Sequence, residues 1–212
     1  MISELKNADG IIFDIDGTIW DIRQLVSEAW EAAIKEKTDL PVTFNAEILG
    51  SLFGKPMNEI FFNLYPEASE ETLDIITPTL YEYEHQYIKE RKPAPYANVR
   101  ETLKKLSEKF KLFVVTNAQK GYVEAMIDAT DMEGIFKGWK CYGDTLQSKD
   151  VTMKMLIEEN NLKNPIYVGD TAGDQDACKK AGVPFIYAEY GLGETDTAKY
   201  SIKNMKELEQ LL

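Results

Sequence analysis

A series of short apolar runs, separated by segments with helical periodicity, constrains the fold more than any other feature of the chain. The runs are rich in β-branched and aromatic residues, which is typical of strands buried on both faces of a sheet. Strands that alternate with helices indicate a parallel sheet covered by helices on both sides. We therefore predict an α/β fold with a doubly wound parallel sheet. Its strands are expected at residues 10–13, 111–115, 139–142, 166–168 and 185–187.

The segment between the first two runs has helical patterns and no convincing strand. Its apolar residues recur with the period of one helix face. An all-helical insertion of this length inside a sheet domain predicts a second, smaller domain. We expect a core domain at residues 1–19 and 96–212 and a helical domain at residues 20–95. The helices expected in the insertion cover residues 25–34, 48–53, 57–64 and 73–88, the last of them kinked or restarted at Pro78.

The chain is acidic, with a net charge of −12 over 212 residues. Nucleic acids and anionic membranes need a basic surface, so neither is expected as a partner. A small phosphorylated molecule is still compatible with this charge, because a metal ion and a few local cations can reverse the field at one site. The sequence has no apolar stretch long enough to cross a membrane, and residues 1–10 lack the order of a signal peptide.

Cysteine and histidine usage argues against a zinc site. Cys141 and Cys178 are far apart, and the only histidine is His85. Zinc sites combine several such residues at short spacing. We interpret both thiols as reduced, which predicts a cytoplasmic protein, and we interpret His85 as a structural residue.

Two carboxylates follow the first apolar run directly. Asp14 and Asp16 stand at the expected end of the strand, and Gly17 lets the chain turn sharply there. Ligands of open parallel sheets bind beyond the carboxyl ends of the strands. Neighbouring carboxylates at such a place repel each other unless a cation binds between them. A hard cation such as Mg²⁺ is suited to carboxylate oxygens. A polar turn after a strand is the simpler alternative.

Polar residues also follow two later runs. Thr116 and Asn117 come after residues 111–115, although such residues often begin loops or cap helices. Asp170 and Asp174 come after residues 166–168, and Asp174 is also suited to cap the helix that follows. Both pairs are expected at the carboxyl edge of the sheet. Lys149 precedes the helical segment that leads to the fourth strand, and position alone distinguishes it from a surface lysine.

In their order along the chain, these motifs resemble the haloacid dehalogenase superfamily. The resemblance rests on residues 14–18, 116–117, Lys149, 169–170 and Asp174. It implies a Rossmann-like core, and the helical insertion is similar to the cap of that family. Residues 95–99 and 176–184 resemble its phosphoglycolate phosphatase branch.

The resemblance implies a phosphohydrolase that requires Mg²⁺ and acts on a small phosphorylated metabolite. Asp14 would be the nucleophile that forms an aspartyl-phosphate, and Asp16 the general acid and base. Thr116 and Lys149 would hold the phosphoryl oxygens. The metal ligands implied are Asp14, Asp16 through its backbone carbonyl, Asp170 and Asp174.

Further residues are expected around the substrate. Lys55 lies in a segment that resembles the part of the cap pointing toward the substrate, where it would bind an anionic group on the leaving portion; a surface lysine is the alternative. Trp20 stands where this branch often has a smaller or polar residue, so the substrate itself stays open. We expect a monomer or a homodimer. The substrate-binding residues expected are Asn117, Lys55, Thr18 and Gly17.

Other functions are compatible with the same motifs. A phosphomutase of the β-phosphoglucomutase kind shares every core motif, and the motifs do not separate a phosphatase from a pyrophosphatase. A true dehalogenase of this superfamily would lack the second aspartate, here Asp16. Two non-enzymatic alternatives are a phosphorylated-aspartate switch, whose known examples are much shorter, and an inactive binding protein, which would usually have lost one of the carboxylates.

Overall fold

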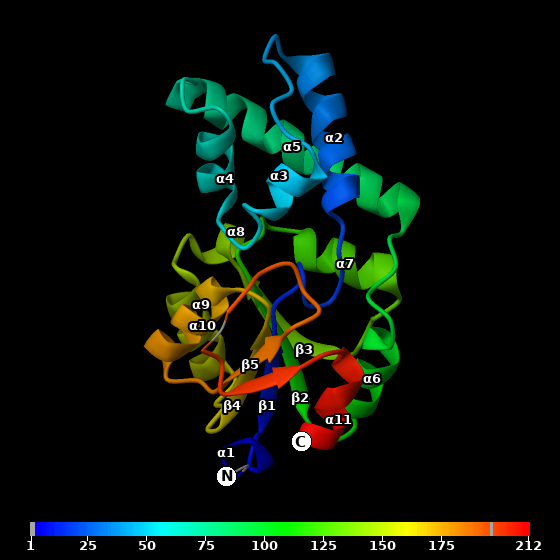
Figure 1. Ribbon diagram of the computed structural model, residues 1–212, viewed down its shortest axis with the longest axis vertical. Helices are drawn as coiled ribbons and strands as arrows, with labels where there is room; N and C mark the ends of the chain where they lie inside the picture. The colour runs from blue at the N-terminus through cyan, green and yellow to red at the C-terminus, as the bar shows by residue number, and fades with distance from the viewer. Residues whose placement is uncertain (1–2, 196) are drawn as a thin grey trace.

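The computed structural model describes residues 3–195 and 197–212, in which a six-stranded sheet has the strand order β3-β2-β1-β4-β5-β6 (Figure 1). All neighbouring strands are parallel. The direction of strand addition reverses at β1, which lies between β2 and β4. In doubly wound sheets such a switch point marks the ligand-binding crevice. The strands are β1 (Gly10–Phe13), β2 (Lys111–Thr116), β3 (Phe136–Cys141), β4 (Pro165–Gly169), β5 (Phe185–Ala188) and β6 (Tyr200–Ile202).

Helices cover both faces of the sheet, which confirms the predicted doubly wound α/β fold. Alternate strand residues point to opposite faces, so Ile11 and Phe13 lie in one hydrophobic cluster and Ile12 lies in the other. The first cluster is completed by α6 (Val99–Leu106), α7 (Tyr122–Thr130) and α11 (Leu208–Leu211), and the second by α9 (Lys149–Glu159) and α10 (Ala172–Ala181).

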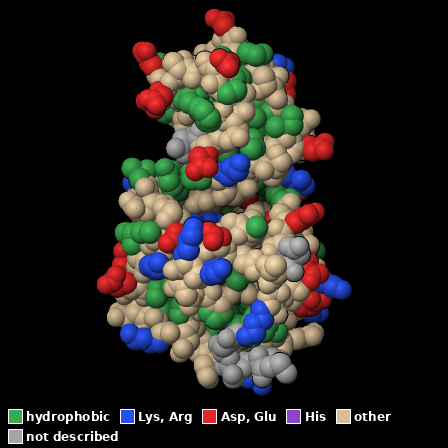
Figure 2. Space-filling view, turned by 60° about the vertical axis from the view of Figure 1, so that its left-hand side comes forward, with side chains coloured by type: hydrophobic (Ala, Val, Ile, Leu, Met, Phe, Trp, Pro, Cys, Tyr) green, Lys and Arg blue, Asp and Glu red, His purple; other side chains and the backbone are tan. Residues whose placement is uncertain are grey.

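The insertion between β1 and β2 is helical, as expected. It contains α2 (Arg23–Lys37), α3 (Ala46–Gly50), α4 (Met57–Leu64) and α5 (Glu70–Arg91), which lie together beyond one end of the sheet in Figure 1. Figure 2 shows the same smaller upper part above the larger lower part, with acidic and basic side chains mixed over this face. The interior of the insertion contains an aromatic contact in which the Trp30 and Phe44 rings meet edge to face at 6.1 Å.

Several element boundaries differ from the sequence prediction. Helix α5 runs through Pro78 without restarting. Strand β3 begins earlier than expected, and Tyr142 opens the short α8 (Tyr142–Thr145) instead of ending the strand. The pattern of β3 was weak because it is an edge strand with a partly exposed middle. The unexpected elements are β6, α8, α11, α1 (Ser3–Lys6) and the 3₁₀ turn η1 (Met205–Glu207).

Of the helices in the described ranges, none combines the length and apolar character that a membrane crossing requires.

Candidate active site

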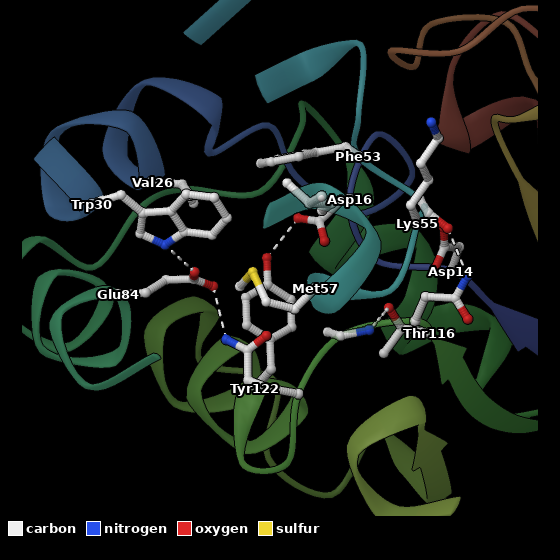
Figure 3. Close-up of a pocket in the computed structure, with 15 residues that line it drawn as sticks. Asp14, Asp16, Val26, Trp30, Phe53, Lys55, Met57, Glu84, Thr116 and Tyr122 are labelled. Carbon is white, nitrogen blue, oxygen red and sulfur yellow. Dashed lines mark hydrogen bonds between the residues drawn. The ribbon is translucent and has the colours of Figure 1, made fainter. Parts of the chain in front are cut away.

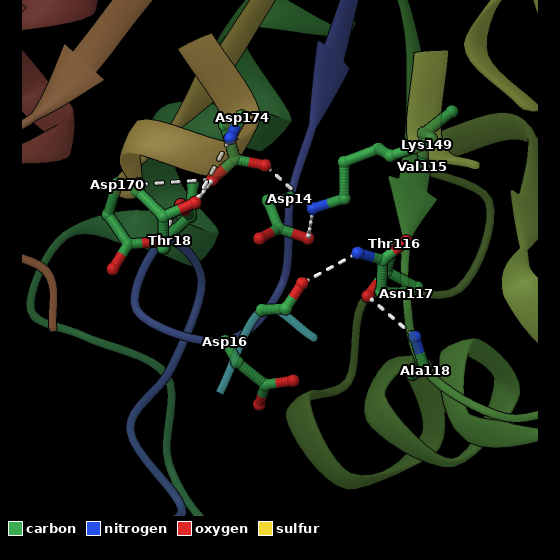
Figure 4. A network of polar contacts seen from close by, with 12 residues as sticks. Asp14, Asp16, Thr18, Val115, Thr116, Asn117, Ala118, Lys149, Asp170 and Asp174 are labelled. Atoms are coloured by element: carbon green, nitrogen blue, oxygen red, sulfur yellow. Dashed lines mark hydrogen bonds and ion pairs between the residues drawn. The ribbon is translucent and has the colours of Figure 1, made fainter. Parts of the chain in front are cut away.

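Three buried aspartates meet at the carboxyl edge of the sheet. Asp14 follows β1, Asp170 follows β4, and Asp174 lies in the first turn of α10 (Figure 4). One carboxylate oxygen from each lies within 4.8 Å of the others. The adjacency of β1 and β4 produces this cluster, because the backbone N–H of Asp14 donates to the carbonyl of Val168 at 2.9 Å. The sheet topology thus joins residues that are far apart in the sequence.

The turn after β1 can be made only by a residue without a side chain. Gly17 has φ of +79°, and a Cβ atom built on it would lie 2.0 Å from Oδ2 of Asp170. A side chain there would collide with the carboxylate and strain the backbone. Thr18 is buried behind this turn, and its hydroxyl donates to Oδ1 of Asp170 at 3.4 Å. Gly17 and Thr18, two of the four residues expected to bind substrate, therefore lie against Asp170 of the acidic cluster.

A loop from the far end of the chain holds Asp170. Its Oδ2 accepts the backbone N–H groups of Leu192 at 2.7 Å and Gly193 at 3.0 Å. Burial raises the pKa of Asp170 to about 6, and the charge of Asp174 acts in the same direction, while these two N–H groups oppose the shift. The loop after β5 thus orients one carboxylate of the cluster, a role for which we found no signal in the sequence.

Asp174 has both of the roles that its position suggested. Its Oδ2 accepts the N–H of Thr171 at 3.0 Å while the Thr171 hydroxyl accepts the N–H of Asp174 at 3.1 Å, so the two residues form a capping box at the start of α10. Its Oδ1 accepts a bond of 2.6 Å from Lys149 and one of 3.2 Å from the hydroxyl of Tyr167. The helix cap therefore aims a carboxylate at the site.

Lys149, the first residue of α9, lies between two of the aspartates. Its Nζ is 2.6 Å from Oδ1 of Asp174 and 3.1 Å from Oδ1 of Asp14, and its side chain is almost completely buried. Burial lowers the pKa of the ammonium, but the charges of Asp14 and Asp174 outweigh burial and raise it overall. Lys149 therefore stays protonated. Its burial and its two ion pairs now distinguish it from a surface lysine.

The remaining charge of the cluster is unbalanced. Burial raises the pKa of Asp14 well above its usual value, and the attraction of Lys149 only partly offsets this. The pKa of Asp174 is instead lowered, because its bonds to Lys149 and Thr171 together outweigh its burial. Two carboxylates whose oxygens lie within 4.8 Å of each other repel each other by at least roughly 3 kcal/mol at an effective dielectric constant of 20. One lysine cannot neutralise three carboxylates.

A divalent cation fits this donor set. Oδ1 of Asp14 is buried and, apart from its ion pair with Lys149, has no hydrogen-bond partner among the described residues. Hard divalent cations bind carboxylate oxygens, and a bound cation would lower the pKa of each carboxyl that faces it. The residues that could hold it are Asp14, Asp170 and Asp174.

Asp16 lies apart from the cluster. Its Oδ1 accepts the hydroxyl of Tyr122 at 2.6 Å and the indole N–H of Trp20 at 3.0 Å, and its carboxylate is directed away from Asp14 (Figure 4). Burial raises the pKa of Asp16 to about 6, although both hydrogen bonds oppose the shift. Trp20, an unusual residue for the resembled branch, thus holds the carboxylate expected to act as acid and base.

The residues after β2 face the same site. Thr116 is buried, and its hydroxyl oxygen accepts the N–H of Ala118 at 3.3 Å. The Asn117 amide donates to the carbonyl of Gly54 at 2.6 Å, and so joins the sheet to the loop between α3 and α4. Lys55 lines the pocket entrance but its side chain is exposed.

A cavity of about 50 Å³ lies between the sheet and the helical insertion. Asp14, Asp16 and Thr116 lie toward one side of it, and Trp30 and Glu84 lie toward the other (Figure 3). Each water needs roughly 10–15 Å³ of such volume, so the cavity has room for a few waters or a few substrate atoms. The arrangement brings together a buried carboxylate, the buried ammonium of Lys149 and a small chamber.

Comparison with known proteins identifies the family. The model of the haloacid dehalogenase-like hydrolases matches residues 11–188, which is most of the chain. The chain belongs to this family. The match confirms the resemblance that the sequence motifs showed and includes the acidic cluster and the helical insertion of this haloacid dehalogenase-like hydrolase.

Similar proteins are found across nearly the whole length of this hydrolase. It is 27% identical to a phosphoglycolate phosphatase of Aquifex aeolicus over 186 residues, or 85% of this chain and 84% of that protein. It is 24% identical to the pyrophosphatase PpaX of Anoxybacillus flavithermus, over 83% of this chain and 81% of that protein. A solved haloacid dehalogenase-like hydrolase from Streptococcus pneumoniae superposes with a TM-score of 0.81 at 19% identity, covering 97% of this chain and 98% of that one.

Sequence reasoning missed several polar residues of this haloacid dehalogenase-like hydrolase. Tyr122 and Tyr167 contact site carboxylates, but a tyrosine at helical or strand spacing looks like a core residue. Glu84 is buried on α5 and accepts bonds from the Trp30 indole at 2.9 Å and the Gln119 amide at 3.0 Å. A glutamate in a helix rich in charged residues gives no sign of burial, so only the packing of the insertion reveals it.

Proposed function

We propose that the protein is a phosphomonoester hydrolase that requires Mg²⁺ and uses Asp14 as its nucleophile. The observation that carries this proposal is the position of Asp14, buried at the switch point of the sheet, beside Lys149 and facing the chamber. Membership of a hydrolase family and relatives named phosphatases support it. A carboxylate is a suitable nucleophile for phosphoryl transfer when cations offset its repulsion by the phosphate.

The chain itself supplies most of the parts for the proposed reaction. Asp14 attacks the phosphorus atom, and the bond between phosphorus and the alcohol oxygen breaks. Asp16 donates a proton to the departing alkoxide and then takes one from the water that releases phosphate from Asp14. Lys149 and Thr116 bind the phosphoryl oxygens.

A Mg²⁺ ion held by Asp14, Asp170, Asp174 and the carbonyl of Asp16 would supply charge neutralisation for the incoming phosphate. The uneven charge of the three-carboxylate cluster supports this metal site, since the single cation paired with Oδ1 of Asp14 among the described residues is shared with Asp174. Because Asp174 is already bonded to Lys149 and Thr171, we expect it to support the site more weakly than Asp14 and Asp170 do.

We also propose that residues 20–95 act as a cap on a core formed by residues 1–19 and 96–212. The cap touches the core at polar contacts, from Asn117 to Gly54 and from Gln119 to Glu84, and its apolar side chains close the chamber. Excluding bulk water strengthens the interactions that stabilise phosphoryl transfer. The substrate we expect is a small phosphorylated metabolite. Pyrophosphate is the second candidate, because one relative is named a pyrophosphatase.

The test is phosphate release from a panel of small phosphomonoesters and pyrophosphate, with Mg²⁺ and with chelator. The wild type should release phosphate only with metal. Asp14→Asn should lower the rate by about a thousandfold or more, because an amide cannot form the aspartyl-phosphate. Asp176→Asn is the matched control, since Asp176 is exposed and forms a surface ion pair with Lys180. Full turnover by Asp14→Asn would refute the mechanism.

Isomerisation of a sugar phosphate without net phosphate release would instead indicate a phosphomutase.

A further inference from the structure

Glu84 is the one buried carboxylate of the described insertion that lines the chamber. It extends from α5, and only 3% of the residue is exposed. Burial raises its pKa to about 7, while hydrogen bonds from Gln119 and Trp30 oppose the shift. The reaction proposed above gives this residue no role.

The hydrogen bonds of Glu84 leave it with spare acceptor capacity. Oε2 accepts one bond from Trp30 and Oε1 accepts one from Gln119. A carboxylate has about four acceptor positions, so each oxygen can accept another donor. Both partners are neutral, and among the described residues no cation is paired with Glu84. Buried carboxylates are usually paired with a cation or fully hydrogen-bonded, so the remaining acceptor positions of Glu84 suit a further donor in the chamber.

Among the residues that the structure describes, the side of the chamber near Glu84 has no cation that would stabilise an anionic leaving group. Its described ionisable lining residues are the carboxylates Asp14, Asp16 and Glu84, the phenol of Tyr122 and the ammonium of Lys55. Lys149 is engaged by Asp14 and Asp174. Lys55 is exposed, and in Figure 3 its ammonium extends away from the side where Glu84 lies. A second negative charge on the substrate would therefore approach Glu84 without a cation to offset it.

The rest of the lining limits the size of the leaving group. Apart from the Gln119 amide, the walls near Glu84 are apolar or aromatic, and the cavity measures about 50 Å³. That volume suits an alcohol of a few heavy atoms. The face of an indole ring also attracts cations, and Trp30 is bonded directly to Glu84. The apolar lining residues are Val26, Trp30, Phe53, Met57, Ile60 and Ala118.

We propose that Glu84 selects the substrate by accepting a hydrogen bond from the leaving portion of the phosphomonoester, which is short and ends in an ammonium or hydroxyl group rather than a carboxylate. The inference rests on the proposed phosphatase function and refines it. The proposed substrate differs from 2-phosphoglycolate, the substrate in the name of one relative, because the glycolate portion of that molecule is anionic.

Four matched substrates test the proposal. Ethanolamine phosphate carries an ammonium, glycerol 1-phosphate carries hydroxyls, ethyl phosphate carries neither, and 2-phosphoglycolate carries a carboxylate. Both donor substrates should have kcat/KM at least about tenfold above ethyl phosphate and 2-phosphoglycolate, because a buried acceptor left unpaired or facing a like charge disfavours binding. The ratio of the two donor substrates shows whether charge or hydrogen bonding dominates.

Glu84→Gln is the critical variant, and Glu82→Gln is its control, because Glu82 is exposed on the same helix. Glu84→Gln should lose about tenfold in selectivity for ethanolamine phosphate over 2-phosphoglycolate, whereas Glu82→Gln should keep the wild-type ratio. If Glu84→Gln lowers kcat/KM equally for all four substrates, Glu84 is structural and the proposal is wrong. A wild type that prefers 2-phosphoglycolate also overturns it.

Binding measurements separate this proposal from the proposed reaction. Asp14→Asn is expected to bind the substrates without turning them over, so calorimetry can compare ethanolamine phosphate with 2-phosphoglycolate in Asp14→Asn and in Asp14→Asn/Glu84→Gln. Absence of all phosphate release by the wild type would refute the reaction. A preference for the ammonium ligand that depends on Glu84 would still support the recognition role, and equal binding of both ligands would refute it.

Discussion

At the scale of single residues, the backbone conformation and the lack of space for a side chain both require glycine at position 17, where Gly17 stands. Its φ of +79° disfavours any side chain, and a Cβ atom would also reach Oδ2 of Asp170. Gly134 has nearly the same φ, +76°, but a Cβ atom added there would meet no other residue within 4 Å. Substituting each glycine in turn therefore distinguishes the effect of backbone strain from the effect of a collision with the acidic cluster.

Gly17→Ala should lower phosphatase activity by about 100-fold, because displacing a catalytic group by about 1 Å has an effect of that size. Gly134→Ala should destabilise the fold by about 1 kcal/mol through left-handed strain alone and leave activity unchanged. Thermal melting and phosphate release measure the two effects. Equal activity of the two variants would show that the contact between Gly17 and Asp170 is unimportant.

Glu84 makes stability depend on pH. Its pKa is about 7 in the folded protein against 4.5 for an ordinary glutamate. The folded state therefore holds the proton more tightly, so this contribution to stability is fully present below pH 4.5 and is lost as the pH rises through about 7. A difference of this size corresponds to about 3 kcal/mol.

In metal-free protein, raising the pH from about 5 to about 8 should therefore destabilise the wild type by about 2 to 3 kcal/mol more than Glu84→Gln, which has no charge to bury. Denaturant unfolding in chelator at both pH values measures the difference. Asp16 also contributes charge near Glu84, and comparing the two proteins cancels its own titration to first order. A stability difference between the two proteins that is the same at both pH values would contradict the prediction.

At the scale of secondary-structure elements, the start of α10 combines a helix cap with a site residue. The Thr171 hydroxyl donates to Oδ2 of Asp174 at 2.6 Å and accepts the Asp174 N–H. The helix cap thus orients a carboxylate that also contacts Lys149. A similar cap at the start of α5, where Ser69 accepts the N–H of Thr72, lies away from the acidic cluster.

Thr171→Ala should destabilise the fold by about 1 kcal/mol through loss of the cap. It should also lower activity or metal affinity by about tenfold or more, as is usual when a group that orients a ligand is lost. Ser69→Ala should have a similar effect on stability and none on activity. Denaturant unfolding and steady-state kinetics test both variants. If both retain full activity, the capping box has no role in the site.

At the scale of the whole molecule, the acidic cluster links metal binding to stability. The sheet forces three buried aspartates together with one lysine. A ligand that binds only the folded state stabilises it by mass action, by about 2.7 kcal/mol at 100 times its dissociation constant. The same cluster that opposes folding without metal should therefore favour it once metal is bound.

Saturating Mg²⁺ should raise the melting temperature by about 5–10 °C relative to chelator, given the usual scaling for a chain of this size. Asp170→Asn should abolish most of the shift, and Asp176→Asn should keep it. Differential scanning calorimetry with and without Mg²⁺ makes the measurement. A shift that persists in Asp170→Asn would place the stabilising metal elsewhere.

Local sequence patterns are enough to predict the alternation of strands and helices, the helical nature of the insertion, and the aspartates at two strand ends. These features depend on local periodicity and on residue types, which are visible along the chain. The edge strands β3 and β6 were predicted poorly or missed, because partly exposed strands lack a continuous apolar run.

The polar groups that orient the site can be identified only from the folded chain. Asp170 is held by a loop that follows β5, Asp16 by Tyr122, and Glu84 by Gln119. Each of these contacts joins segments distant in sequence, and hydrogen-bond partners at such distances leave no periodic signal. Strand order brings the carboxylates together, and the packing of the insertion buries Glu84 against the chamber, because burial is set by what folds onto a residue and not by its neighbours in the chain.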